Sequence, residues 1–197
     1  MIDHENQELT ADALVRLVHR YYPPGVLIDE PQYKNSAEAQ RLEKLLREAM
    51  QNMHDWEQFV RRLHDEFPGC MIWDQTLLQH APCYVCQVAL PGVEMGGDRY
   101  DAVVCMLSLL APVYAIYATH SLNTGPLLDS WLRFPPLPPE FQSHEARLAS
   151  LIESTFGFTR LSDEVLSTPV PELRPRTGHF SLGGARLIDC LFTPNRF

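Results

Sequence analysis

Apolar residues follow a helical spacing in the first part of the chain. Between residues 10 and 22 they form one stripe, which consists of Leu14, Leu17, Val18 and Tyr21. Thr10 precedes this stripe, and its hydroxyl can accept a bond from one of the free N–H groups at a helix start. We therefore expect a short helix over residues 10–22, ended by two prolines and a glycine.

A second and longer amphipathic stretch follows. Asn35 can cap it, and Glu38 stands at the spacing of a capping box. Its stripe keeps three-and-four spacing and consists of Leu42, Leu45, Leu46, Ala49, Met53, Trp56, Val60, Leu63 and Phe67. The pattern predicts either one long helix or two helices that meet near residues 52–55, before a proline and a glycine end the stretch.

The pattern changes at residue 70. Short runs of β-branched and aromatic residues alternate there with glycine and proline, as is typical of a sheet. The predicted strands are Cys70–Trp73, Tyr84–Leu90, Ala102–Leu109 and Val113–Thr119. Glycines and a proline between the second and third strands indicate an antiparallel hairpin with a long loop.

The remaining segments complete the expected fold. Glu145–Phe156 is predicted as a helix capped by Ser143 and ended by Gly157, a helical turn follows at 162–166, and Ala185–Phe192 is predicted as a strand. We expect one α+β domain over residues 1–197, with a helical part at 1–68 and a sheet-rich part at 69–197. In it, the N-terminal helices pack on a mainly antiparallel sheet that a further helix and a C-terminal strand complete.

Composition narrows the class of protein. Apolar residues make up 45% of the chain, enough for a globular core, and 25 acidic against 16 basic residues give a net charge of −9. This charge repels a phosphate backbone, so we expect no nucleic-acid partner. The start of the chain lacks the features of an export signal, and no apolar run is long enough to cross a membrane. With an odd number of cysteines, five, the sequence favours reduced thiols and a soluble, cytoplasmic protein.

Cys83 and Cys86 form a C-x-x-C motif. A redox site would need the first cysteine at a helix start, and a zinc site would need a second pair of ligands, which the sequence does not supply. The motif lies on a predicted strand, where residues three apart point to opposite faces. We expect buried structural thiols and no cofactor, with metal binding and redox chemistry by this pair as the alternatives.

One histidine is the best candidate for acid/base chemistry. His120 lies at a predicted strand end, beside several small polar residues. It could act as acid/base with a carboxylate such as Asp101, or Cys83 could act as a thiol nucleophile. An enzyme with such a site, assembled from residues distant in the sequence, is one hypothesis for function.

The preferred hypothesis is a protein-binding module. The loop before the third strand carries Glu94, Asp98 and Asp101, which could pair with basic side chains of a partner. Aromatic anchors for the same surface are Trp73, Tyr100 and Trp131. The sequence therefore favours an inhibitor of the immunity or antitoxin type that masks a basic partner protein.

Overall fold

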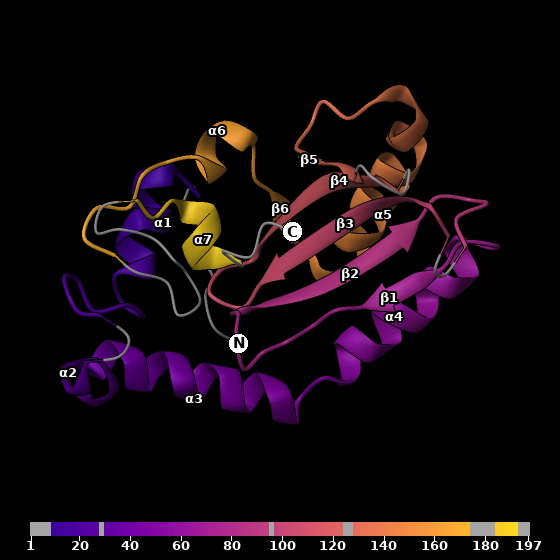
Figure 1. Ribbon diagram of the computed structural model, residues 1–197. Coiled ribbons are helices and arrows are strands. Elements are labelled where there is room, and N and C mark those ends of the chain that lie inside the picture. Colours follow the sequence, from indigo (N-terminus) through magenta and orange to yellow (C-terminus); the bar gives the residue numbers. More distant parts are fainter. Residues whose placement is uncertain (1–8, 28–29, 95–96, 124–127, 174–183, 193–197) are drawn as a thin grey trace.

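The predicted α+β class is confirmed by the structure, a computed structural model that describes residues 9–27, 30–94, 97–123, 128–173 and 184–192. Five strands run antiparallel in the order β1-β2-β3-β4-β5, and a sixth, β6, pairs parallel with β4 (Figure 1). The strands are β1 (Ile72–Asp74), β2 (Cys83–Ala89), β3 (Arg99–Ser108), β4 (Val113–Asn123), β5 (Leu128–Arg133) and β6 (Thr159–Arg160). The hairpin predicted between the second and third strands is confirmed by β2 and β3.

Four helices precede the sheet: α1 (Ala11–Val18), α2 (Pro31–Asn35), α3 (Ala37–Gln51) and α4 (His54–Glu66). The helix expected at 10–22 is confirmed as α1, although it ends earlier, at Val18, and the Thr10 hydroxyl caps it by accepting from the Ala13 N–H at 3.2 Å. The long stripe forms two helices, α3 and α4, so the second of the two alternatives is confirmed. Asn35 as the cap is wrong: it ends α2, and Ser36 caps α3 by accepting from the Ala39 N–H at 3.1 Å.

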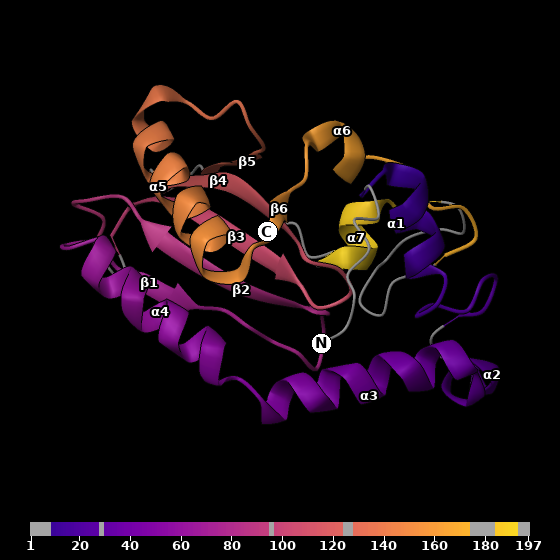
Figure 2. The same ribbon diagram turned by 180° about the vertical axis from the view of Figure 1, so that it is seen from behind.

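Two helices cover one face of the sheet, which we call the α4/α5 face. Helix α5 (Pro139–Phe156) crosses it, and α4 lies beside β1 (Figure 2). Because side chains alternate along a strand, Cys86 and Val88 point to this face and join a single core with both helices. Its largest buried side chains include Trp56, Phe59, Leu63, Phe141, Leu148 and Ile152.

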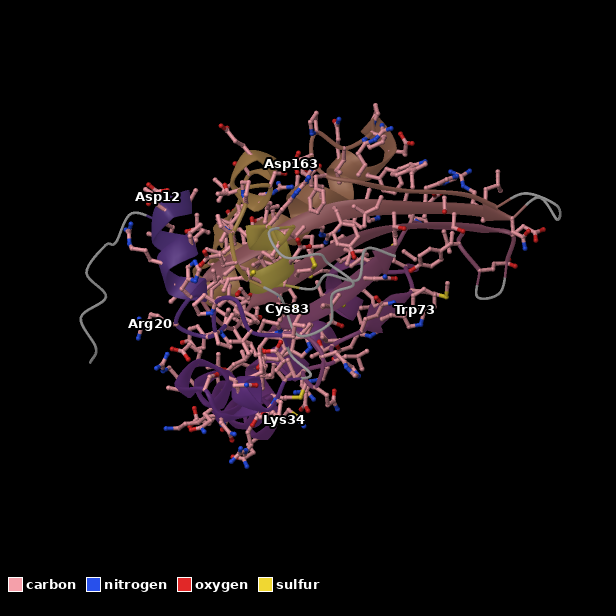
Figure 3. The ribbon with its side chains drawn as sticks, turned by 60° about the vertical axis from the view of Figure 1, so that its left-hand side comes forward. Asp12, Arg20, Lys34, Trp73, Cys83 and Asp163 are labelled. Atoms are coloured by element: carbon pink, nitrogen blue, oxygen red, sulfur yellow. The ribbon has the colours of Figure 1, made fainter. Side chains whose placement is uncertain are left out.

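The opposite face is covered along only part of its length, and we call it the half-open face. At the end where β2 and β4 begin, α1, α3 and α7 (Leu187–Leu191) pack in one core with Cys83 and Val85. Tyr22 secures this packing by donating its hydroxyl to the Cys190 carbonyl at 2.9 Å. Figure 3 shows Cys83 beside α7 and Trp73 farther along the sheet, beyond that packed end.

The start of α5 and two whole elements also differ from expectation. Ser143 does not cap α5, because the helix already begins at Pro139. Proline suits that first turn, where the backbone N–H that it lacks would have no partner within the helix. The predicted strand Ala185–Phe192 is wrong: residues 187–191 form helix α7, which is buried on all sides. Strand β5 had no counterpart among the predicted elements. Gly157 does end α5, with a left-handed φ of 67°, and the helical turn at 162–166 is α6 (Asp163–Leu166).

Candidate functional site

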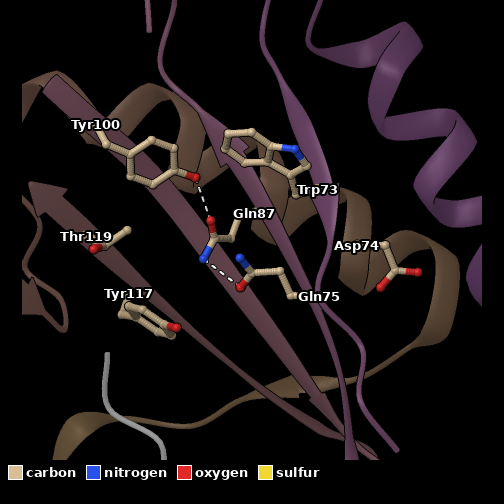
Figure 4. Close-up of a pocket in the computed structure, with 7 residues that line it drawn as sticks. All are labelled: Trp73, Asp74, Gln75, Gln87, Tyr100, Tyr117 and Thr119. Carbon is tan, nitrogen blue, oxygen red and sulfur yellow. Dashed lines mark hydrogen bonds between the residues drawn. The ribbon is translucent and has the colours of Figure 1, made fainter. Parts of the chain in front are cut away.

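A groove opens on the uncovered part of the half-open face. It encloses a cavity of about 450 Å³. Its lining comes from strands β1 to β4 and the turn after β1, and consists of Trp73, Asp74, Gln75, Gln87, Tyr100, Tyr117 and Thr119 (Figure 4). Strand alternation explains why Tyr117 and Thr119, which lie two apart on β4, both face the groove.

The polar side chains of the groove form a connected row. The Tyr100 hydroxyl donates to Gln87 Oε1 at 2.5 Å, and Gln87 Nε2 donates to Gln75 Oε1 at 2.7 Å. Gln87 is 6% exposed, so these bonds satisfy a side chain that is nearly buried in the sheet. Burial also raises the pKa of the Tyr100 phenol, which keeps the hydroxyl protonated as a donor. The row is therefore fixed before any ligand binds.

Aromatic rings form the walls beside this row. The rings of Trp73 and Tyr100 lie 5.5 Å apart between centroids, at 33°. Asp74 is the one charged residue of the described lining, and its carboxylate is directed elsewhere: it accepts from Trp56 Nε1 and from the Thr76 N–H, each at 2.9 Å. Figure 4 shows the Asp74 side chain turned away from the other lining residues. The groove itself thus presents uncharged aromatic and amide groups.

Acidic side chains lie at the β2–β3 loop. Glu94 and Asp98, which the sequence suggested as partner-binding residues, are both exposed, and Asp98 stands two residues before Tyr100. The backbone fixes that position, because the Asn123 N–H donates to the Asp98 carbonyl at 2.6 Å. Asp98 therefore lies on the approach to the strand that carries Tyr100.

Asp101 differs from the two loop acids. It points to the α4/α5 face and is 2% exposed. Its Oδ1 lies 2.5 Å from His120 Nδ1, and its Oδ2 accepts from Arg99 Nε. The structure thus brings together the histidine and the carboxylate that sequence reasoning had paired, and the Asp101 side chain is buried.

Trp131 lies on the same side as His120, away from the groove. It pairs with His120 in the β4–β5 register, and the two rings stack with centroids 5.3 Å apart. The Arg133 guanidinium lies 5.1 Å from the Trp131 centroid, and Phe141 meets the indole edge-on. Of the three predicted aromatic anchors, Trp73 and Tyr100 therefore share one site, and Trp131 belongs to another.

The cysteines of the C-x-x-C motif are buried on opposite faces, so the expected divergence of their sulfurs is confirmed. Both side chains are fully buried, and burial raises the pKa of each thiol. Cys105, opposite Cys86 in the register, is equally buried, with its pKa raised to about 12. Within the described ranges, no group of three or more His, Cys, Asp or Glu side chains is arranged to hold a metal ion.

Sequence reasoning missed most of the residues that line the groove. Gln75, Gln87, Tyr117 and Thr119 were not among the candidate residues. One signal was available: Gln87 interrupts the otherwise apolar run from Val85 to Leu90, and a polar residue inside a buried strand needs a partner. The identity of that partner depends on the strand register, which the sequence alone does not supply.

Comparison of the chain with protein-family models, curated proteins and solved structures gives no match. Fold and groove together define the class: an α+β protein whose antiparallel sheet has one covered face and one half-open face with an aromatic and amide groove. In the part of the chain that the structure describes, no helix is long and apolar enough to cross a membrane.

Proposed function

We propose that this protein is a binding module whose groove receives a basic side chain of a partner protein, in the manner of an immunity or antitoxin-like inhibitor. One observation carries the proposal. Tyr100 of the uncharged groove follows the exposed Asp98 by two residues, and Asp98 shares the β2–β3 loop with the exposed Glu94. We call Glu94 and Asp98 the rim carboxylates.

The chemistry of the groove suits an arginine. A guanidinium stacks on aromatic faces and donates in its own plane, so it can lie on Trp73 or Tyr100 and reach an amide oxygen. Gln75 Oε1 already accepts one hydrogen bond from Gln87 and has a second lone pair available. The cavity of about 450 Å³ lies within the range that binding sites for small groups occupy.

Long-range electrostatics supports the same partner. The net charge of −9 attracts a basic protein, and the rim carboxylates orient it toward the groove. Because exposed charges are screened by salt, we expect binding to weaken as ionic strength rises.

Affinity purification with matched variants tests this proposal. The tagged full chain is compared with a rim variant, Glu94→Lys with Asp98→Lys, and with a groove variant, Thr119→Arg, which places a cation in the cavity. The control, Glu43→Lys with Glu57→Lys, makes the same change of charge at exposed positions on α3 and α4. Circular dichroism verifies that each variant folds, and mass spectrometry identifies retained proteins.

The expected result is a basic protein that the wild type and the control retain, and that the rim and groove variants lose. Its binding to the purified wild type should be direct and sensitive to salt. If every protein retained by the wild type is equally retained by the rim and groove variants, the groove is not the binding site and the proposal fails.

A second candidate function, an enzyme, is favoured by the hydrogen bond of 2.5 Å between Asp101 and His120. A buried carboxylate on one ring nitrogen orients an imidazole for proton transfer through the other. Cys83 is a poor nucleophile for such an enzyme, because it is fully buried with a raised pKa. Turnover of an ester or phosphodiester that His120→Gln abolishes would favour this candidate, and turnover unchanged in that variant would remove it.

The cytoplasm is the compartment we propose. All five cysteines are free thiols, which a reducing environment maintains. Fractionation of the producing cells, followed by immunoblotting, tests this assignment.

A further inference from the structure

A cysteine and a histidine meet away from both sites described above. Cys70 lies between α4 and β1, and His144 lies on α5. The Cys70 Sγ and His144 Nε2 atoms are 3.6 Å apart. All five cysteines belong to the described part of the chain, and Cys70 alone among them is not buried.

The surroundings of His144 fix its ring. Phe67 stacks on the imidazole, with centroids 5.5 Å apart at 21°. His144 Nδ1 lies 3.4 Å from the Ser143 hydroxyl oxygen, which can accept a hydrogen bond from Nδ1 when this nitrogen carries the ring proton. In that tautomer the lone pair of Nε2 is directed at the sulfur of Cys70. The ring is thus held as a proton acceptor for this thiol.

We propose that Cys70 is a reactive thiol that exchanges with low-molecular-weight disulfides, with His144 as its base. The Cys70 thiol proton passes to His144 Nε2, and the thiolate attacks one sulfur of the disulfide. The S–S bond of the reagent breaks, and its departing thiolate takes the proton from the imidazolium. Cys70 is oxidised to a mixed disulfide, and the other half of the reagent is reduced to a thiol.

The electrostatics of the pair makes the base necessary. Burial raises the pKa of the Cys70 thiol, so the sulfur is protonated at neutral pH. Burial, and then the charge of Arg147, lowers the pKa of His144, so the imidazole is neutral and able to accept a proton. Arg147 pairs with Glu66 at 2.9 Å and lies over the Phe67 ring. A neutral thiol beside a neutral imidazole reacts only after proton transfer between them.

Reaction with glutathione disulfide at neutral pH, followed by intact-protein mass spectrometry, tests the proposal on the full chain. We expect one adduct per chain on Cys70, absent from Cys70→Ser. His144→Gln is expected to slow the reaction by roughly 100-fold, the lower end of what a positioned base contributes. His64→Gln, at an exposed histidine on α4, is the control and should react at the wild-type rate.

Two further readouts separate a base from a merely structural histidine. Raising the pH well above the ordinary cysteine pKa should bring His144→Gln toward the wild-type rate, because the thiol then ionises without help. Ser143→Ala, at an exposed position where folding is not at risk, should slow the reaction by a smaller factor. The proposal is overturned if neither His144→Gln nor Ser143→Ala slows the reaction, if a buried cysteine reacts first, or if the wild type forms no adduct.

Discussion

Replacing His120 by alanine should destabilise the protein more than an ordinary surface substitution does. The imidazole interacts with the Asp101 carboxylate at 2.5 Å and stacks on Trp131. The side chains of His120 and Asp101 are 15% and 3% exposed, so water cannot readily replace the lost contact. Asp101 would keep Arg99 as its remaining partner.

The magnitude follows from these contacts. A hydrogen bond to a charged group contributes about 1.5–3 kcal/mol, and ring stacking adds about 0.5–1.5 kcal/mol. The substitution His120→Ala should therefore lower the free energy of unfolding by about 2–4.5 kcal/mol. The interaction free energy between His120 and Asp101 alone should amount to about 1.5–3 kcal/mol, well above the roughly 0–1 kcal/mol of an exposed ion pair.

A double-mutant cycle measures this coupling. Urea unfolding, followed by circular dichroism, is recorded for the wild type, His120→Ala, Asp101→Ala and the double variant at one pH and ionic strength. The exposed pair of Arg147 and Glu66, replaced by alanine in the same way, is the control and should give less than about 1 kcal/mol. A coupling between His120 and Asp101 below about 0.5 kcal/mol would refute the reasoning, because distant, independent sites add within that margin.

Three further predictions concern helices and pH. Trp56→Phe removes the indole N–H that Asp74 accepts at 2.9 Å, and should cost about 2–3 kcal/mol in urea unfolding; an unchanged stability would contradict the hydrogen bond. Gly157→Ala meets no atom within 4 Å, so only the strain of φ 67° acts, and a loss of about 1 kcal/mol is expected from thermal unfolding; a much larger loss would indicate a contact we have missed. Burial raises the pKa of the Cys105 thiol from 9.0 to about 12, so the folded state favours the neutral thiol. The resulting contribution to stability is complete below pH 9 and is lost as the pH rises from 9 toward 12, because the unfolded chain then ionises first. Cys105→Ala should therefore lose less stability than the wild type between pH 8 and pH 11 in thermal scans; an equal loss would contradict burial as the cause.

Elements with local signals were predictable from the sequence. The α1 helix has a threonine cap and a clear stripe, and the β2–β3 hairpin is bounded by glycine and proline. The break between α3 and α4 was left open, because Met53 keeps the apolar spacing across it. Such spacing indicates which side chains face a core, but it does not indicate whether one straight helix continues through the stretch.

Two elements, α7 and β5, were predicted wrongly or not at all, because tertiary packing determines their structure. Residues 187–191 are buried on every side in α7, so their run of apolar residues has no helical period and resembles a buried strand. The local signal of α7 in the sequence was Asp189, an acidic residue in the first turn of the helix. Its carboxylate accepts from the Arg186 N–H at 2.9 Å, a bond typical of a helix start. Strand β5 is a short edge strand that carries Asp129, Ser130 and Arg133, and pairing with β4 gives it its structure.

The groove arises because the side chains of two strands, β2 and β4, change from apolar to polar along the half-open face. On the half-open face, successive side chains of β4 change from apolar to polar: Val113, Ala115, Tyr117, Thr119 and Ser121. Strand β2 changes in its own register, from Cys83 and Val85 beneath the helices to Gln87 in the groove. On the α4/α5 face the same strands stay apolar through Val88 and Ala118, because α4 and α5 cover them.

A sheet that only lacked a covering helix would expose apolar side chains there, and contiguous apolar patches are the mark of an unfinished core or an interface. Here the uncovered positions carry amides and hydroxyls, and three of these side chains, Tyr100, Gln87 and Gln75, are already joined by hydrogen bonds. Such a surface is stable in water without a partner and still offers aromatic faces and free lone pairs. That combination suits reversible binding, and it is the reason why our proposal places the binding site in the groove and not on the better-covered face.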